Sequence, residues 1–353
     1  MTANSLAYKE VYQRASQKCI PLGVLFELTY RCNLRCAHCY VTKGEQPDEL
    51  KLDEICSIID QLAEAGCLFL TFSGGESLLR EDFFDIVNFA RKRNFAIGIF
   101  TNGTTITPAI ADRIRDSFPF KVEVSLYGIK KDTYEEVTRV EGSYERVRRG
   151  IDLLVERHVP LVLKTNAMRG NCHQIGQIQN FAKESGATFR CDGMIIPMID
   201  GGRGPLKNRA TDRQLENFFD VMFNKITPNW EPKFDRPRDG SICDAARSTA
   251  VIDPYGKLSP CATLRQEGCD LRERPFLEVW KESPQLNRIR ALTWSDAQEC
   301  GDCQLLPYCR HCLGISSLEE GDMFAALRES CRQARIKKRV YEKKIYQGTN
   351  SNL

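Results

Sequence analysis

The chain has 353 residues, a length that indicates one large domain and a smaller one. Charged residues make up 27% and hydrophobic residues 42%, which excludes a disordered chain, and the net charge of +3 is too small to indicate a nucleic-acid partner. Residues 1–19 contain no continuous apolar stretch, so we expect no signal peptide, no membrane partner and a cytoplasmic protein. In that reducing compartment, sixteen cysteines favour metal or thiol chemistry over disulfides.

Short apolar runs alternate with amphipathic helical patterns after an N-terminal extension at 1–21. This alternation is typical of repeated βα units and a parallel sheet. We expect strands at 23–28, 68–72, 96–101, 121–126, 161–166 and 188–195, with helices at 52–65 and 144–157 among the connections. Six such units are too few to close an eight-stranded barrel. The pattern therefore predicts an α/β fold, a partial (β/α)6 TIM-like barrel over 22–205, with ligands at the carboxyl ends of the strands.

The regular alternation ends after residue 205. A bridging region at 206–240 carries one amphipathic helix, 212–226. Residues 241–335 are dense in cysteine and have few long apolar runs, so we expect metal ligation rather than a hydrophobic core to fix this small cysteine-rich C-terminal iron–sulfur domain. The segment 323–345 indicates a basic helix, and 336–353 is expected to form the basic C-terminal helix and tail.

Three cysteines lie directly after the first predicted strand, with the spacing CX3CX2C: Cys32, Cys36 and Cys39. Three thiolates can hold three corners of a cubane iron–sulfur cluster and leave the fourth iron without a protein ligand. That iron can then chelate the amino and carboxylate groups of a bound molecule. A zinc site with His38 as fourth ligand is the alternative, although zinc knuckles favour paired CX2C units.

The motif CX3CX2C, followed by the aromatic Tyr40, resembles the radical S-adenosylmethionine (SAM) enzymes, and the resemblance covers residues 22–200. It implies that the cluster cleaves SAM reductively into a radical. Gly74, Gly75 and Glu76 follow the second predicted strand and are similar to the family's Gly-Gly-Glu motif, in which the backbone and the carboxylate receive the SAM ammonium. Glycines permit close backbone approach, and a carboxylate pairs with a cation.

Further SAM-binding candidates follow from the same resemblance: Tyr40, Asn102, Ser125 and Arg139. Asn102 and Ser125 lie at the ends of the third and fourth predicted strands. Turn chemistry at Asn102, a satisfied strand hydroxyl at Ser125 and surface solvation at Arg139 are the alternative readings. The sequence identifies no catalytic acid or base.

A second series of cysteines is similar to the SPASM domain, an auxiliary-cluster module of radical enzymes, over residues 243–331. The resemblance implies two further clusters, one on Cys300, Cys303, Cys309 and Cys331 and one on Cys243, Cys261 and Cys312. The usual module ends with CX3C, whereas here only two residues separate Cys309 from Cys312. His311 and Cys269 are therefore candidate extra ligands, and zinc at the CX2C pairs is the alternative.

Together the resemblances imply a 5'-deoxyadenosyl radical that abstracts hydrogen from a peptide, foremost a ribosomally made precursor, for crosslinking, epimerisation, excision or oxidation. The implied cofactors are SAM and three iron–sulfur clusters, one SAM-binding 4Fe–4S cluster and two auxiliary clusters of the same type. The implied partners are the precursor peptide, a separate leader-peptide-binding protein, since only a short segment precedes the first strand, and an electron donor of the flavodoxin or ferredoxin type.

Two other classes of function stay open. One is a radical SAM enzyme that acts on a different substrate. It would be either a sulfatase-type maturase that oxidises Cys or Ser in a protein or an enzyme of a cofactor or porphyrin pathway. The other is a non-enzymatic iron–sulfur carrier. Gly74, Gly75 and Glu76 argue against the carrier, because a carrier does not need to bind an amino acid.

Overall fold

The centre of the computed structural model is an eight-stranded sheet with the order β6-β5-β4-β3-β2-β1-β7-β8. The model describes residues 3–42, 48–234, 237–265 and 269–350. Neighbouring strands are parallel except for the antiparallel pair β7 and β8. The strands are β1 Gly23–Thr29, β2 Phe69–Gly74, β3 Ala96–Thr101, β4 Lys121–Ser125, β5 Leu161–Asn166, β6 Thr188–Asp192, β7 Thr249–Ile252 and β8 Leu258–Ser259. All six predicted strands are present, and the sheet stays open within the described residues, which confirms the partial barrel.

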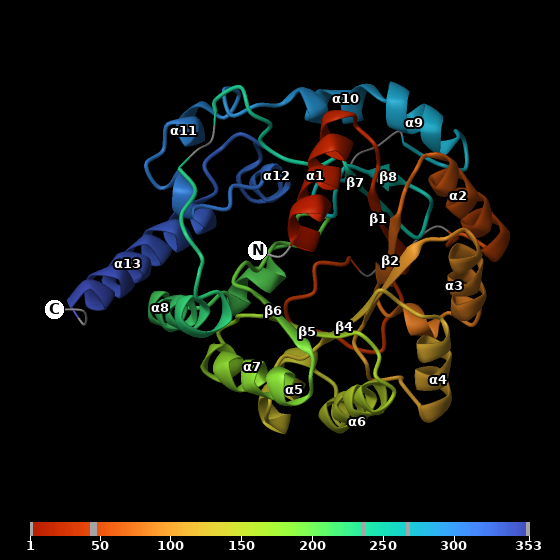
Figure 1. The fold of residues 1–353 in the computed structure, drawn as a ribbon, viewed down its shortest axis with the longest axis horizontal. Helices are drawn as coiled ribbons and strands as arrows, with labels where there is room; N and C mark the ends of the chain where they lie inside the picture. The colour runs from red at the N-terminus through yellow and green to blue at the C-terminus, as the bar shows by residue number, and fades with distance from the viewer. Residues whose placement is uncertain (1–2, 43–47, 235–236, 266–268, 351–353) are drawn as a thin grey trace.

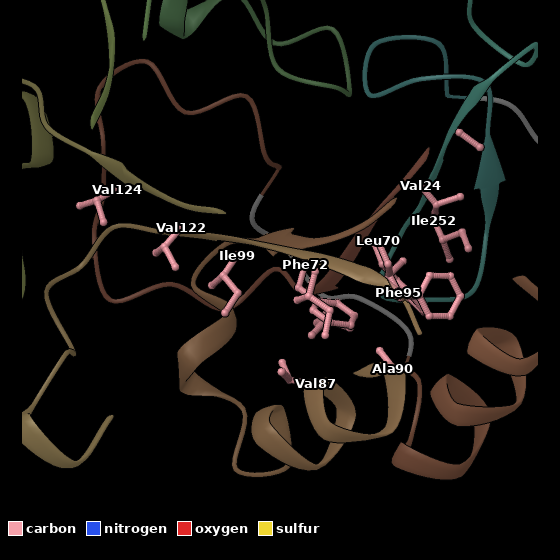
Figure 2. Packing of buried hydrophobic residues seen from close by; sticks show 14 of the residues in the cluster. Val24, Leu70, Phe72, Val87, Ala90, Phe95, Ile99, Val122, Val124 and Ile252 are labelled. Carbon is pink, nitrogen blue, oxygen red and sulfur yellow. The ribbon is translucent and has the colours of Figure 1, made fainter. Parts of the chain in front are cut away.

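Helices cover the outer face of the curved sheet, as Figure 1 shows. They are α2 Leu52–Glu64, α3 Phe83–Lys92, α4 Pro108–Asp116, α5 Lys131–Thr138, α6 Ser143–Glu156 and α7 Ile175–Glu184. Because side chains alternate along a strand, one face of the sheet is apolar and packs against these helices. Phe72 and Ile99 point toward Val87 and Ala90 of α3 (Figure 2). The opposite face carries the polar side chains described below.

The helices begin and end close to the positions predicted from the apolar periodicity. The predicted helices 52–65 and 144–157 correspond to α2 and α6, each within one residue at either end. The predicted helix 212–226 is α8 Asp212–Val221, which continues as a π-helical turn, η4 Met222–Ile226. A capping box starts α8, since Thr211 accepts a hydrogen bond from the Gln214 amide and the Gln214 side chain accepts one from the Thr211 amide.

The cysteine-dense region shares the main hydrophobic core, which corrects one prediction. β7 pairs in parallel with β1 and extends the sheet. The next helices, α9 Phe276–Glu282 and α10 Pro284–Ala291, bury Phe276, Trp280 and Leu286 in the same core as the barrel helices. The expectation that metal ligation rather than a core fixes this region is therefore wrong for residues 249–292, where apolar burial supplies the stabilisation.

The end of β6 and the start of α13 differ from prediction, and in each case an aspartate side chain closes a turn there. β6 ends at Asp192 rather than at residue 195, where the Asp192 carboxylate accepts a hydrogen bond from the Met194 amide at 2.9 Å. The last helix, α13 Arg328–Asn350, begins five residues later than predicted, after Asp322 accepts a hydrogen bond from the Phe324 amide. α13 also runs through the predicted domain boundary at residue 335.

The remaining elements are short or peripheral. They are α1 Ala3–Gln17, which lies in the predicted N-terminal extension, η1 Ser77–Leu79, η2 Cys172–Gln174, η3 Gly204–Asn208, α11 Gln298–Gly301, η5 Leu306–Tyr308 and α12 Leu313–Glu320. The outermost residues of the predicted end segments, 1–2 and 351–353, lie outside the described residues. Over the described part of the chain, no helix combines the length and the apolar character needed to cross a bilayer.

Candidate functional site

The loop that carries Cys32, Cys36 and Cys39 follows β1 and is held by backbone hydrogen bonds to the end of α5. The amide of Arg35 donates to the carbonyl of Thr138 at 3.0 Å, and the amide of Ala37 donates to the carbonyl of Val137 at 2.8 Å. Within the loop, the Cys39 amide donates to the Cys36 carbonyl at 3.1 Å. The irregular loop is therefore fixed against the barrel at the carboxyl end of the strands.

Tyr127, which follows β4, lies near the three thiols of this loop. Burial raises the pKa of Tyr127, and the charges of Cys36, Cys39 and Cys32 raise it further. The Ser125 side chain lies close enough to Tyr127 to lower the pKa of its hydroxyl, so Ser125 is also near this group. Among the described residues, no three His, Cys, Asp or Glu side chains are close enough to hold a metal ion as they stand.

The turn at Gly74 and Gly75 packs directly against the start of the cysteine loop. The Gly75 amide donates to the Thr29 carbonyl at 2.7 Å, and the Glu76 amide donates to the Arg31 carbonyl at 2.9 Å. A Cβ atom on Gly75 would lie 2.3 Å from the Arg31 carbonyl oxygen, and Gly74 has a φ of 128°. Only glycine fits at both positions, so the sequence Gly-Gly is required to bring the end of β2 against the loop.

Glu76 is completely buried and joins the ends of β2 and β3. Its carboxylate accepts hydrogen bonds from the Asn102 amide at 2.6 Å, the Thr101 hydroxyl at 2.8 Å and the Leu78 amide at 3.3 Å. Burial raises the pKa of Glu76 to about 7, although these hydrogen bonds oppose the shift. Glu76 is therefore a rigidly positioned carboxyl group that titrates near neutral pH.

Asn102 connects the end of β3 to the cysteine loop. Its side-chain amide donates to the Asn33 carbonyl oxygen at 2.8 Å and lies 3.9 Å from the Cys32 sulfur as a weak donor. Its own carbonyl oxygen accepts from the Thr104 amide at 2.9 Å. These contacts place Asn102 beside both Cys32 and Glu76.

Tyr40 and Arg139 occupy different surroundings. The Tyr40 hydroxyl donates to the buried carboxylate of Glu27 on β1 at 3.3 Å. Arg139 is exposed at the C-terminal end of α5, where it takes a left-handed conformation with a φ of 57°. It directly follows Thr138, whose carbonyl holds the cysteine loop, so its backbone lies beside the loop.

His38 is a member of this site that the sequence reasoning treated only as a zinc ligand. Its ring packs edge-on against Tyr127 with 4.6 Å between the ring centroids. Burial lowers the pKa of His38 to about 4, and the Lys164 ammonium lowers it further, so the imidazole is neutral at physiological pH. Its Nδ1 atom is buried without a hydrogen-bond partner. The sequence signal that could have identified His38 as a site residue is its position between Cys36 and Cys39.

A second missed group links the barrel to the cysteine-rich region. The Glu27 carboxylate accepts hydrogen bonds from the Tyr30 hydroxyl at 2.7 Å and from one nitrogen of Arg265 at 2.9 and 3.1 Å. Glu27 is fully buried. Because Arg265 lies far along the chain in an irregular segment, no local sequence pattern predicts this pair.

The cysteines of the C-terminal region fall into two groups. In the first, the Thr263 hydroxyl lies 3.4 Å from the Cys261 sulfur and 3.8 Å from the Cys312 sulfur. Burial raises the pKa of Cys243 to about 11, and the nearby Cys261 and Cys312 add to the shift. Cys261 and Cys312 therefore lie on either side of Thr263, with Cys243 near them.

The second group contains Cys300, Cys303, Cys309 and Cys331. Burial raises the pKa of Cys300, and the charges of Cys331 and Cys303 raise it further. Cys309 packs against the small hydrophobic cluster that includes Cys300. These four cysteines are the set that the resemblance assigned to one cluster.

The two candidate extra ligands lie in different places. The His311 Nδ1 atom is 3.7 Å from the Cys300 sulfur, beside the second group. Cys269 is buried in the main core, where its sulfur lies 3.4 Å from the Ser283 hydroxyl. His311 is therefore the better placed of the two.

Comparison with known proteins agrees with this geometry. Residues 26–177 match the model of the Radical SAM superfamily, and residues 243–313 match that of SPASM, an iron-sulfur cluster-binding domain. The chain therefore contains a radical SAM domain and a SPASM domain. These two domains imply a SAM-binding 4Fe–4S cluster and auxiliary clusters.

The chain resembles proteins with different named activities. An AdoMet-dependent heme synthase of Methanosarcina barkeri is 27% identical over 86% of this chain and 94% of the relative. A mycofactocin maturase, MftC, of Mycobacterium tuberculosis is 27% identical over 82% of this chain and 77% of the relative. The Streptococcus suis protein SuiB, solved bound to the precursor peptide SuiA, has a similar fold, with a TM-score of 0.66 and 17% identity over 88% of this chain and 77% of SuiB.

The thiol groups fit the clusters that the radical SAM and SPASM domains imply. In each C-terminal group, neighbouring cysteines raise one another's thiol pKa, so several thiolates can coexist there only beside a compensating cation. Metal binding supplies that charge and deprotonates the thiols. Soft thiolate donors are the ligands that iron–sulfur clusters use.

Proposed function

We propose that this enzyme uses an electron to cleave SAM into methionine and a 5'-deoxyadenosyl radical, which takes a hydrogen atom from a peptide, foremost a ribosomally synthesised precursor. The observation that carries the proposal is the meeting of four strand ends at one place. The β1 loop with its cysteines, the Gly74–Gly75 turn at the end of β2, Asn102 after β3 and Ser125 at the end of β4 lie together there.

In this proposal, Cys32, Cys36 and Cys39 hold the cluster that supplies the electron when bound. Gly74, Gly75 and Glu76 receive the SAM ammonium, as a buried carboxylate and close backbone allow. Four further residues are proposed to complete the SAM site, namely Tyr40, Asn102, Ser125 and Arg139. Asn102 is well placed for this role, because hydrogen bonds to Asn33 and Thr104 fix its amide beside Cys32.

We propose three clusters in total, with the auxiliary ones on Cys243, Cys261 and Cys312 and on Cys300, Cys303, Cys309 and Cys331. The proposed domains are the barrel at 22–205, the bridging region at 206–240 and the SPASM domain at 241–335. An electron donor of the flavodoxin or ferredoxin type and a separate leader-peptide-binding protein are the proposed partners. The maturase relative and the peptide-bound structure of SuiB support a peptide substrate.

The first test is anaerobic reconstitution followed by addition of dithionite and SAM. We expect 5'-deoxyadenosine and methionine in equal amounts, and none from the protein in which Cys32, Cys36 and Cys39 are replaced by alanine. Formation of 5'-deoxyadenosine by the triple variant would contradict the role of these cysteines. Co-expression with candidate short peptides, followed by mass spectrometry, then tests the substrate, since a loss of two hydrogens indicates crosslinking or oxidation.

A porphyrin substrate is the second candidate, because a heme synthase is 27% identical over 94% of its own length. Incubation of the reconstituted enzyme with a porphyrin carboxylate in place of peptides separates the two. Decarboxylated or oxidised porphyrin, formed together with 5'-deoxyadenosine, would favour this candidate over the peptide.

A further inference from the structure

The inner face of the sheet carries a group of charged side chains on its last three barrel strands. Val122 and Val124 of β4 are buried with the helices on the outer face, so the alternate residues of the strand point inward. The inward set consists of Lys121 and Glu123 on β4, Lys164 on β5 and Arg190 and Asp192 on β6. We call these five residues, with Arg310, the inner charge cluster.

Glu123 is the buried centre of this cluster. One of its carboxylate oxygens accepts hydrogen bonds from the Lys121 ammonium at 2.6 Å and from the Arg190 guanidinium at 2.7 Å. Its other oxygen is buried and has no hydrogen-bond partner. A single carboxylate thus faces two cations and leaves one positive charge without compensation.

Lys164 adds a further positive charge close to the SAM site. Its ammonium lies 5.1 Å from the centre of the Phe100 ring, and its charge also acts on His38 in the cysteine loop. In the described part of the chain, Lys164 forms no salt bridge. Burial lowers the pKa of Lys164, and the Glu123 carboxylate opposes this shift. A half-buried ammonium without an ion-pair partner is costly unless an anion binds there.

The SPASM domain contributes to the same cluster. Arg310, between Cys309 and Cys312, donates to the Asp192 carboxylate at the end of β6 at 2.6 Å. The cluster then holds four cations, Lys121, Lys164, Arg190 and Arg310, and two carboxylates, Glu123 and Asp192, so that two positive charges remain. The side chain of Arg190 is 55% exposed, which leaves part of its guanidinium accessible to a ligand.

We propose that the substrate of this enzyme presents a carboxylate to the barrel, and that Lys164 and Arg190 bind it. This inference rests on the proposed function and names the chemical class of its substrate. Paired with an ammonium and a guanidinium, a carboxylate makes charge-assisted hydrogen bonds and neutralises the surplus charge. Such a group can come from an Asp or Glu side chain of a peptide or from the side chain of a porphyrin.

The experiment compares neutral and acidic probes on the reconstituted full-length enzyme. In the peptide arm, two pools of random decapeptides are mixed in equal amounts, one with a fixed central Glu-Glu and the other with Gln-Gln. Peptides retained on the immobilised enzyme are counted by mass spectrometry. In the porphyrin arm, protoporphyrin IX is compared with its dimethyl ester by absorbance titration.

We expect about a ten-fold preference for the acidic probe in one arm, the size of a charge-assisted contact, and the arm that shows it identifies the source. The preference should vanish in Lys164→Gln and fall in Arg190→Gln, whereas Lys164→Arg should keep it. Lys183→Gln removes the same charge from the exposed surface of α7 and should keep it too.

Equal binding of acidic and neutral probes in both arms would overturn the inference, as would a preference that survives in Lys164→Gln. Melting curves of each variant exclude a folding defect as the cause of lost binding. Formation of 5'-deoxyadenosine in the same samples tests the proposed function separately. If the enzyme cleaves SAM but shows no preference for acidic probes, only the inference of a substrate carboxylate is refuted.

Discussion

In the proposed site, SAM binding depends on the ionisation of one buried carboxyl group, that of Glu76. A carboxyl group with a pKa of about 7 is largely protonated in mildly acidic solution, whereas pairing with the SAM ammonium requires the ionised form. Burial also strengthens the pairing, because a charge is less screened there than in water. Binding of SAM should therefore displace a proton from Glu76.

The first prediction is that the affinity for SAM weakens as the pH falls from 8 to 6, approaching about ten-fold per pH unit below the pKa of Glu76. Glu76→Gln removes the titrating group and should give weaker binding with a flat profile over this range. Isothermal titration of the anaerobic, reconstituted protein measures both. Glu81→Gln, the same change at an exposed position, should keep the wild-type profile. A pH-independent affinity in the wild type would contradict the role of Glu76.

The positions of single motif residues could be predicted where the order of the backbone elements alone determines them. Gly74, Gly75 and Asn102 follow strands whose carboxyl ends meet at one edge of the sheet, so their proximity to the cysteine loop follows from the order of the elements. The contact of His38 with Tyr127 depends on the path of two irregular loops. No periodicity specifies such a path, and for that reason neither ring was assigned its place from the sequence.

Among the elements, β1 is joined to the SPASM region by a buried ion pair. Glu27 points to the inner face of β1 and is fully buried, and Arg265 reaches it from a segment more than two hundred residues later. The hydroxyls of Tyr30 and Tyr40 complete the hydrogen bonds of the carboxylate. Removing one partner of a buried pair leaves an uncompensated charge, which costs more than the pair itself contributes.

We predict that Arg265→Met lowers the free energy of unfolding by about 3–5 kcal/mol. The double variant Glu27→Gln/Arg265→Met should recover part of this loss, because the buried charge is then absent. Arg272→Met is a matched control, since Arg272 pairs with the partly exposed Glu54 and should cost at most about 1 kcal/mol. Urea unfolding measures all three. Equal losses for Arg265→Met and Arg272→Met would show that the Glu27 pair is not a buried contact.

Elements whose apolar residues recur with a clear period could be predicted from the sequence, and elements without such a period could not. β1 to β6 are runs of apolar residues between marked amphipathic helices, a pattern that long segments make reliable. β7 consists of only four residues, Thr249–Ile252, in a cysteine-dense stretch, and its pairing with β1 joins positions far apart in the chain. The neighbouring helices α9 and α10 were not predicted because they are short. Each makes only about two turns.

For the whole molecule, the fold separates cysteines that are neighbours in sequence. Cys309 and Cys312 form a CX2C pair, the spacing in which two thiols commonly bind one metal. Here Cys312 lies with Cys261 at Thr263, whereas Cys309 packs against the hydrophobic cluster that includes Cys300. The chain between them carries Arg310 toward Asp192 of the barrel. This short segment therefore touches both thiol groups and the inner charge cluster.

The last prediction tests this division by counting iron. Cys309→Ala and Cys312→Ala should each remove about four of about twelve irons, but from different clusters. The double variant Cys261→Ala/Cys312→Ala should then lose no more iron than either single variant, since both changes affect one cluster. The double variant Cys309→Ala/Cys312→Ala should lose about eight. Iron analysis and the electron paramagnetic resonance of the reduced protein measure these losses.

Cys56→Ala is the control, because Cys56 lies on α2 and belongs to none of the three proposed ligand sets, so this change should leave the iron content unchanged. If Cys309→Ala/Cys312→Ala lost only about four irons, the CX2C pair would serve one cluster, as sequence spacing alone suggests. A loss of about eight would instead show that tertiary packing, not spacing, assigns the ligands. The segment from Cys309 to Cys312 would then hold both auxiliary clusters in place beside the barrel mouth through one short stretch of chain.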